Sequence, residues 1–445
     1  DYLFMNLHPK AYFYYLTNLA KQTRDYRINK DKKRAFQERR LSYLVRHASK
    51  KVPLYRHLYK ENGIDPTKVR NLEDIKRLPL VLKEQMREAG NKAIAIGFDK
   101  KNLQLKNTSG STGHVFSTYF TFEDAAINGI VYDLAMMRVG YRPFRDLLAI
   151  TASPSNHTER KWYESLGVKR RFFLRIYLGA KHLVKEIQTK RPDVIYGSPS
   201  ALQMISREVI ESSAIMPENA RLVFTAGERL FPRARSMMSE ALGPDPFEIY
   251  GSWEAGLIAS QCEEHSCLHI NWQNVILEVI KGGDKVSPGE RGEVVITNLY
   301  SSAMPFIRYR LGDVARLREE SCSCGREGLV LEDIEGRLND FITLENGRIV
   351  SPLLINSAMK SLSWIHQFRV IQLDYRSFKV MVITKHDQLP DLPSLREMMY
   401  VVLGDNSLDV EVEAVDFIPE VRKRMAIMSK VPCPLAANYL PSPVG

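Results

Sequence analysis

The chain has 445 residues, enough for two or three domains, and its 44% hydrophobic and 26% charged residues are typical of a globular protein. No window approaches the ~20 consecutive apolar residues of a membrane-spanning helix, and the N-terminus lacks the small-residue cleavage site of a signal peptide. The net charge of +11 is compatible with nucleic acid, an anionic membrane or a polyanionic small molecule, but RNA-binding signatures are missing and we expect no nucleic-acid partner.

Residues 1–95 are rich in Lys and Arg and predict a helical N-terminal part. Between 96 and 260, short apolar strands alternate with helical patterns. One such pair is the strand "PDVIYG" (192–197), followed by the helix "PSALQMISREVIES" (199–212). Strands that are regularly followed by helices indicate a parallel α/β sheet with covered faces.

From 261 to 335 the pattern changes to short β segments, which predict a small antiparallel barrel or sheet. Residues 340–431 combine an alternating hairpin, a helix and a further strand, which is the content of a ferredoxin-like module. The expected fold class is therefore α/β. A large N-terminal domain, 1–339, contains parallel α/β sheet subdomains plus a small β-barrel region, and a small α+β domain follows it. The Pro-rich residues 432–445 predict a loose tail.

The stretch "TSGSTG" (108–113) places four hydroxyl side chains around two glycines, after a predicted strand end. Glycines let backbone N–H groups approach an anion closely, and hydroxyls donate to phosphate oxygens without a fixed charge. The spacing and the lysine of a Walker loop are absent. By itself the stretch fits either a phosphate-binding loop or an ordinary polar loop.

Four further motifs follow in order: "TAGERL" (225–230), "YGSWEAG" (250–256), "TNLYSSAMPFIRYRLGD" (297–313) and "IEGRLND" (334–340). Each of the first two follows a predicted strand. Open α/β sheets bind ligands at the carboxyl ends of their strands. The ordered set resembles the adenylate-forming superfamily, and within it the phenylacetate–CoA ligase-like branch, which includes coenzyme F390 synthetase-like and capsule-locus (CapK-like) members. The stretch 52–87 is also similar to that branch, and the resemblance covers roughly residues 45–431.

The resemblance implies that ATP activates a carboxylic acid as its acyl-adenylate. It implies that the loop holding the β,γ-phosphates consists of Thr108, Ser109, Gly110, Ser111, Thr112 and Gly113, with Thr112 also catalytic. The implied nucleotide contacts are Gly227 and Glu228 at adenine and ribose, Tyr250, Gly251 and Ser252 at adenine, and Asp313 and Arg337 at ribose. Glu254 matches the catalytic acid at Mg²⁺ and the α-phosphate. Asp340 matches the hinge about which the small, mobile C-terminal domain turns.

Three positions depart from the family pattern. The phosphate loop is followed by His114 where the family usually has Lys, and Trp253 stands where it usually has Thr. Lys423 aligns with the family's catalytic lysine, but Arg422 replaces the preceding glycine in a loop about two residues short. Arg422 or Arg424 is the alternative cation.

Five cysteines, an odd number, argue against a disulfide framework and favour a reducing, cytoplasmic location. Four of them form two tight pairs, in "CEEHSCLHI" (262–270) and "CSCGR" (322–326). A structural zinc ion needs four nitrogen or sulfur ligands. Cys262, His269, Cys322 and Cys324 supply such a set, which resembles that of zinc-bearing members of the branch. His265 or Cys267 could replace His269, and small core cysteines without metal are the alternative.

The expected function is that of an ATP-dependent, AMP-forming ligase that uses Mg²⁺ and passes the acyl group to coenzyme A. Tyr196, Trp253 and Ile258 suit an apolar or aromatic acid. One alternative is transfer to an amine, a hydroxyl or a carrier-protein thiol. Another is a degenerate, non-catalytic nucleotide-binding protein. The identity of the acid and the formation of a homodimer are left open by the sequence.

Overall fold

The computed structural model describes residues 14–19, 29–108, 116–152, 167–318, 320–337, 340–385, 388–418 and 426–433. Most of the predicted phosphate loop, 109–113, lies outside these residues, as does the candidate cation Lys423 with its neighbours Arg422 and Arg424. Of the helices in the described part of the chain, none combines the length and the apolar composition that crossing a bilayer requires.

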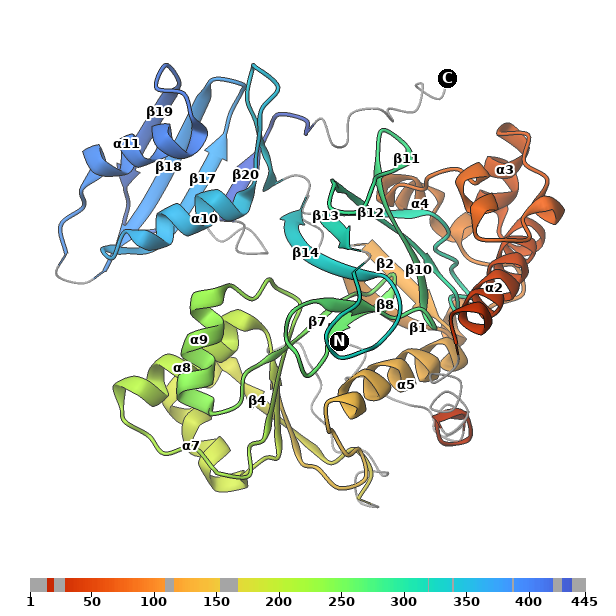
Figure 1. The fold of residues 1–445 in the computed structure, drawn as a ribbon, viewed down its shortest axis with the longest axis horizontal. Helices are drawn as coiled ribbons and strands as arrows, with labels where there is room; N and C mark the ends of the chain where they lie inside the picture. Colours follow the sequence, from red (N-terminus) through yellow and green to blue (C-terminus); the bar gives the residue numbers. More distant parts are fainter. Residues whose placement is uncertain are drawn as a thin grey trace.

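A twelve-stranded sheet forms the centre of the N-terminal part (Figure 1). Its strands are β3 Leu148–Ala152, β4 Arg171–Arg175, β5 Val194–Gly197, β6 Leu222–Ala226, β7 Phe247–Ser252, β8 Gly256–Gln261, β9 Leu268–Ile270, β10 Val275–Lys281, β11 Asp284–Lys285, β12 Arg291–Asn298, β13 Tyr309–Arg318 and β14 Val330–Arg337. Their order is β11-β10-β12-β13-β14-β9-β8-β7-β6-β5-β3-β4. Strands β4, β3, β5, β6 and β7 are parallel, as predicted.

The antiparallel β region is not separate from this sheet. Strand β8 pairs antiparallel with both β7 and β9, and β9 pairs with β14. The parallel and antiparallel halves are therefore continuous, and the predicted antiparallel segments extend one edge of the α/β core. The α/β fold class is confirmed.

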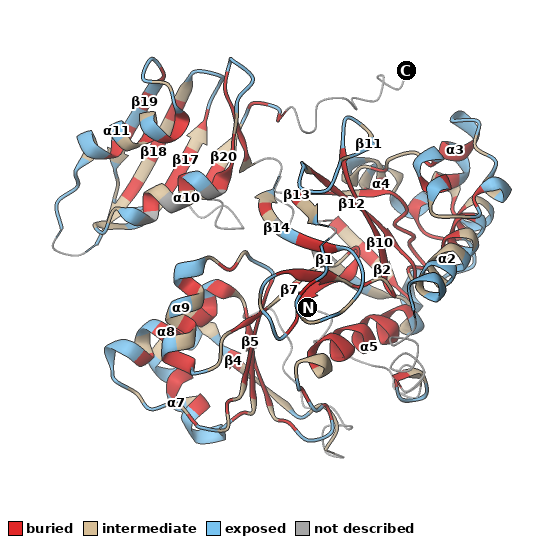
Figure 2. Ribbon diagram, in the orientation of Figure 1, coloured by how far each residue is buried: buried red, intermediate tan, exposed pale blue. Residues whose placement is uncertain are grey.

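Helices cover both faces of the parallel half. On one face lie α7 Ala180–Lys190, α8 Pro199–Glu211 and α9 Pro232–Leu242, and on the other lies α5 Phe122–Arg138. Alternate strand residues serve the two faces, so that Ile195 packs toward α7–α9 while Tyr196 packs on the α5 side. Figure 2 shows α5 buried along nearly its whole length. It begins at a capping box in which Thr121 and Asp124 satisfy each other's backbone N–H groups.

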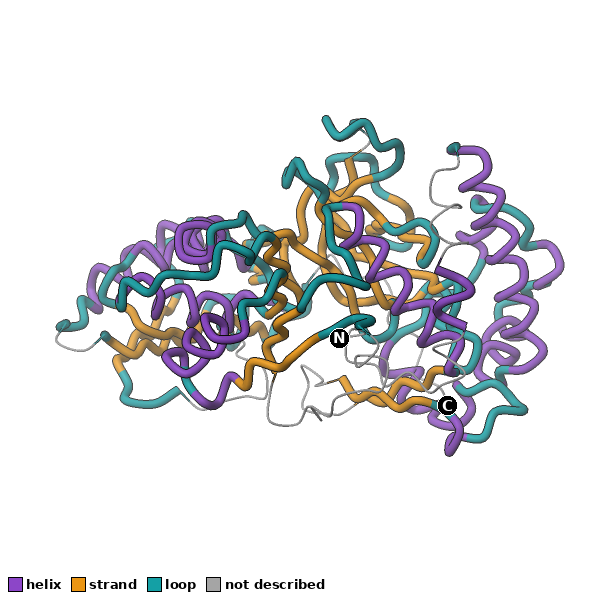
Figure 3. The backbone as a smooth tube through the Cα atoms, turned by 90° about the horizontal axis from the view of Figure 1, so that it is seen from below, coloured by secondary structure: helices purple, strands orange, loops and turns teal. Residues whose placement is uncertain are grey.

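Helices α2 Lys30–Lys51, α3 Pro53–Glu61 and α4 Lys83–Ala89 pack against the antiparallel half of the sheet. A separate hairpin, β1 Gln104–Thr108 and β2 Phe116–Phe120, flanks the predicted phosphate loop. Seen from below (Figure 3), strands run through the middle of the molecule and helices gather on its two sides.

The C-terminal part has its own hydrophobic core. Strands β17 Ile365–Gln372, β18 Ser377–Thr384, β19 Asp409–Ala414 and β20 Ile427–Ser429 form a sheet in the order β19-β18-β17-β20. It packs with α10 Pro352–Ser361, α11 Leu392–Leu403 and the short pair β15 Ile342–Thr343 and β16 Ile349–Val350. Helix α10 lies beside β14 (Figure 1), where a Cβ on Gly336 would lie 3.1 Å from Pro352 Cγ.

Candidate active site

Glu254 lies in the tight turn between β7 and β8 and is only 6% exposed. Its Oε1 accepts a hydrogen bond from the Tyr309 hydroxyl at 3.3 Å and lies 3.9 Å from Lys83 Nζ. Burial lowers the pKa of Lys83, whereas the Glu254 carboxylate raises it. The turn therefore presents a nearly buried carboxylate that is held by one phenol and one ammonium group.

Two asparagines hold the turn from behind, and both are fully buried. Asn298 Nδ2 donates to the Glu254 carbonyl at 3.0 Å, and Asn274 Nδ2 donates to the Ala255 and Leu257 carbonyls at 2.6 and 2.9 Å. These bonds satisfy the carbonyl groups of Glu254 and Ala255 in the turn and of Leu257 near the start of β8. The position of Glu254 thus depends on side chains that reach it from β12 and from the loop before β10.

Replacing Asn298 with Leu is expected to lower the free energy of unfolding by about 1–3 kcal/mol, because the Glu254 carbonyl then stays buried without its donor. Urea unfolding of the variant measures this loss. Asn91→Leu, at an exposed position, is the matched control and is expected to change stability little. Equal stability of the Asn298 and Asn91 variants would show that the hydrogen bond from Asn298 to the Glu254 carbonyl does not stabilise the fold.

Asp313 and Arg337 are cross-strand partners on β13 and β14. Arg337 Nε lies 2.9 Å from Asp313 Oδ1, and the Tyr250 hydroxyl donates to Asp313 Oδ2 at 2.7 Å. Burial, followed by the Asp313 carboxylate, holds the pKa of Tyr250 well above its usual value, so this phenol stays a donor. Three of the predicted nucleotide contacts, Tyr250, Asp313 and Arg337, are therefore brought into one hydrogen-bonded group.

Two other predicted residues lie at the neighbouring strand end. Gly227 directly follows β6 with φ +84°, a conformation that favours glycine. The exposed Glu228 accepts from the backbone N–H of Ser200 at 3.0 Å and from its hydroxyl at 2.9 Å, in the first turn of α8. Thr108 ends β1 and is paired with Phe116, so the hairpin anchors both ends of the predicted phosphate loop.

Sequence analysis missed Lys83, Tyr309 and the two clamping asparagines. Tyr309 lies within the quoted "YRLGD" motif, whereas Lys83 begins a helix in the stretch that resembles the family's N-terminal part. A lysine directly after the apolar run "LPLVL" was the available signal for Lys83. Position in the sequence could not show that this lysine approaches Glu254.

Four predicted metal ligands meet next to β9, which lies between β14 and β8 in the sheet. The ligand atoms of Cys262, His269, Cys322 and Cys324 all lie within 4.8 Å of one another. Cys262 Sγ is 3.6 Å from Cys322 Sγ, and Cys324 Sγ is 3.4 Å from His269 Nε2. A tetrahedral Zn²⁺ with bonds of ~2.3 Å to sulfur and ~2.0–2.1 Å to nitrogen needs ligand separations of about 3.5–3.8 Å. The four side chains thus fit a structural zinc ion.

The two alternative ligands lie differently. His265 stacks on Phe247 with ring centroids 4.2 Å apart, and its Nδ1 faces Asp245 at 3.5 Å, outside the four-residue group. Cys267 lies beside the group, with Sγ 3.9 Å from His269 Nε2. The geometry favours His269 as the fourth ligand.

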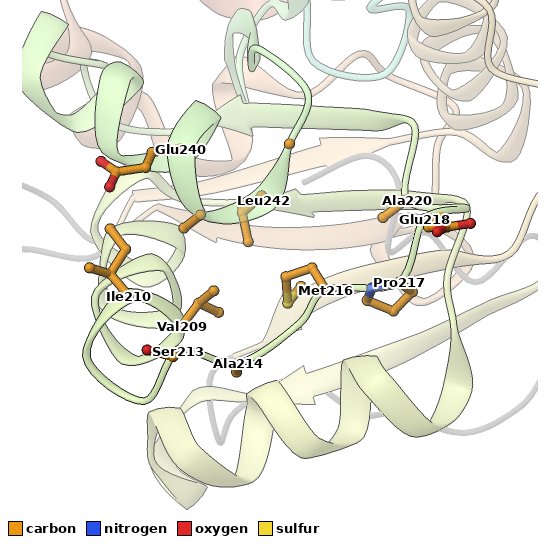
Figure 4. Close-up of a pocket in the computed structure, with 12 residues that line it drawn as sticks. Val209, Ile210, Ser213, Ala214, Met216, Pro217, Glu218, Ala220, Glu240 and Leu242 are labelled. Atoms are coloured by element: carbon orange, nitrogen blue, oxygen red, sulfur yellow. The ribbon is translucent and has the colours of Figure 1, made fainter.

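A cavity of about 540 Å³ lies elsewhere, near the carboxyl-terminal ends of α8 and α9 (Figure 4). Its lining includes Val209, Met216 and Leu242, and it contains no predicted site residue. The motifs, rather than this cavity, define the candidate active site.

Known proteins resemble the chain along nearly its whole length. It is 28% identical over 436 residues to a phenylacetate–coenzyme A ligase of Thermus thermophilus, covering 93% of this chain and 94% of the relative. It is 21% identical over 408 residues to the protein CapK of Staphylococcus aureus, covering 88% of each. No protein-family model matches the chain.

Among solved structures, 2-hydroxyisobutyryl-CoA ligase in complex with R3-HIB-AMP, in the postadenylation state, matches with a TM-score of 0.71 and 22% identity over 90% of each chain. The anthranilate CoA ligase AuaEII with anthranoyl-AMP matches with a TM-score of 0.54 and 17% identity, covering 80% of this chain and 74% of that one. The chain therefore shares the fold of these two CoA ligases. Together with the sequence relatives, this confirms the resemblance to the phenylacetate–CoA ligase-like branch.

Proposed function

We propose that the protein is a cytoplasmic, ATP-dependent, AMP-forming ligase that activates a carboxylic acid and transfers the acyl group to coenzyme A. The observation that carries the proposal is that Glu254, in the β7–β8 turn, lies close enough to the Tyr250–Asp313–Arg337 group to interact electrostatically with Tyr250 and Arg337. The full-length similarity to phenylacetate–coenzyme A ligases supports the acid–thiol ligase class.

The residues of the group have separate roles in this proposal. The Asp313 carboxylate, fixed by Arg337 and Tyr250, accepts hydrogen bonds from the ribose hydroxyls. The acid's carboxylate attacks the α-phosphorus and pyrophosphate leaves in line, so the site must neutralise charge on both sides. Lys83 supplies positive charge beside Glu254, and the loop at 108–113 holds the leaving phosphates.

Two metal ions fit the residues present. Glu254, nearly buried and next to a cation, is the carboxylate that would hold Mg²⁺, which neutralises phosphate charge when bound. Zinc held by Cys262, His269, Cys322 and Cys324 would have a structural role, because four protein ligands leave no open position. Lys423 stays our candidate for the C-terminal catalytic lysine, and Asp340 for the hinge.

Acid-dependent exchange of labelled pyrophosphate into ATP tests the adenylation step, with a panel of small aliphatic and aryl acids. Exchange with at least one acid is expected. If ATP binds normally but no acid supports exchange, the non-catalytic nucleotide-binding alternative is favoured and the proposal is wrong.

The acyl acceptor is tested separately on the acid that works best. Coenzyme A is expected to accelerate AMP release and to yield a thioester. Turnover that depends instead on an amine, a hydroxyl compound or a carrier protein would contradict transfer to coenzyme A and leave the adenylation step standing.

A further inference from the structure

The hairpin before the phosphate loop carries its side chains in an unexpected pattern. In β2, Phe116, Thr118 and Phe120 form the buried face. Lys106 on β1 lies directly opposite Thr118, and cross-strand partners share a face of the sheet. Leu105, the preceding residue, is 49% exposed. The hairpin thus turns a leucine to solvent and a lysine to the interior, the reverse of what burial alone favours.

The Lys106 ammonium has an aromatic neighbour but no acidic one among the described residues. Its Nζ lies 5.3 Å from the centre of the Trp253 ring. Burial lowers its pKa, and no neighbouring carboxylate opposes that shift. Lys83 differs, since it faces Glu254. A half-buried cation that lies beside an indole ring and, within the described part of the chain, faces no carboxylate is costly to keep, and such groups are concentrated at ligand sites.

The position of this ammonium indicates which ligand it meets. Lys106 lies two residues before the phosphate loop, and Trp253 directly precedes Glu254. Trp253 packs against the core cluster that contains Tyr132, Tyr196 and Leu257. That cluster lies on the α5 side of the sheet and contains Tyr196, one of the residues predicted to suit an apolar or aromatic acid. Lys83 already places a cation next to Glu254 itself.

We propose that Lys106 and Trp253 form an anion subsite that binds the carboxylate of the acid and holds it beside the phosphate loop. The inference rests on the proposed function and adds a specificity element to it. It also gives a role to Trp253, which stands where the family usually has a hydroxyl residue. The indole ring stabilises the Lys106 ammonium by a cation–π contact. Uncharged acid analogues, such as primary amides, are expected to bind poorly.

The test measures binding, so that it does not depend on turnover. Isothermal titration calorimetry with acetate, benzoate and phenylacetate is done in the presence of α,β-methylene-ATP. Lys106→Met keeps the apolar stem and removes the charge, and Lys106→Arg keeps the charge. Lys101→Met, an exposed lysine just before the hairpin, is the matched control.

In Lys106→Met we expect carboxylate Kd to rise about 10- to 100-fold, because one partner of a partly buried charge pair is lost. The Kd of the ATP analogue is expected to stay within about 3-fold, and Lys106→Arg to recover most of the carboxylate affinity. The thermal midpoint of Lys106→Met should not fall, since the removed charge is half-buried and has no acidic partner among the described residues. Lys101→Met should resemble the wild type.

The failures are distinguishable. Unchanged carboxylate affinity in Lys106→Met overturns the subsite alone, and so does a selective loss of affinity for the ATP analogue. A wild-type protein that binds the analogue but none of the carboxylates contradicts the subsite, whereas absence of pyrophosphate exchange with the whole acid panel is what contradicts the proposed ligase activity.

Discussion

Replacing Glu254 with Gln is expected to lower the rate of pyrophosphate exchange by about 10²- to 10³-fold, the usual cost of losing one electrostatic element of a preorganised site. The change is nearly isosteric, so the bond from Tyr309 can be kept while the negative charge is lost. Steady-state exchange, with ATP, acid and Mg²⁺ varied in turn, measures the effect. We expect the apparent affinity for Mg²⁺ to fall with the rate.

The same variant has a predicted pH dependence. Glu254 raises the pKa of Lys83 against the lowering effect of burial, so Glu254→Gln should lower that pKa further. The ammonium is charged below its pKa and loses its charge as pH rises. The rise in KM for ATP on the alkaline side should therefore begin at lower pH in the variant than in the wild type.

Glu211→Gln, an exposed glutamate at the end of α8, is the matched control and should leave the rate unchanged. A Glu254→Gln enzyme with wild-type exchange at saturating Mg²⁺ would show that this carboxylate has no part in adenylation.

The architecture was predictable because, in most of the described chain, the hydrophobic pattern of each segment agrees with the helix or strand that the structure forms there. The strand predicted at 192–197 is β5 Val194–Gly197 in the structure. The helix predicted at 199–212 is α8 Pro199–Glu211. The order of the motifs also identified Tyr250, Asp313 and Arg337, which the fold brings into hydrogen-bond distance. The continuity of the two sheet halves was missed, because nothing in the residues of β8 states that it pairs on both sides.

The sequence did not reveal which side chains from distant segments contact the turn that carries Glu254. Lys83 approaches Glu254 only because α4 packs on the antiparallel half of the sheet. Asn274 and Asn298 look like ordinary polar residues at strand ends, and only the turn they face reveals their use. The role of Lys106 could not be predicted, because strand alternation alone does not determine whether Leu105 or Lys106 faces the interior. Functional sites are where local preference and tertiary placement disagree.

Removal of zinc is expected to separate the two halves of the active site. Cys262 follows β8 and His269 lies in β9, whereas Cys322 and Cys324 lie between β13 and β14. Strands β9 and β14 are joined by only two residue pairs, His269 with Val330 and Leu268 with Leu331. A metal ion at this seam would hold the strands of Tyr250 and Glu254 against those of Asp313 and Arg337.

We therefore expect metal analysis to find one zinc per chain. With free zinc at ~1,000 times its Kd, binding stabilises the fold by about 4 kcal/mol. A strong chelator or the Cys322→Ser substitution should therefore lower the unfolding free energy by that amount. KM for ATP should rise as well, because the Tyr250–Asp313 contact crosses the seam. Cys433→Ala, at a buried cysteine outside the group, is the matched control and should retain zinc. Well under one zinc per chain, together with unfolding that is insensitive to the chelator, would mean that the cluster is a small apolar core of thiols and that backbone pairing alone closes the sheet.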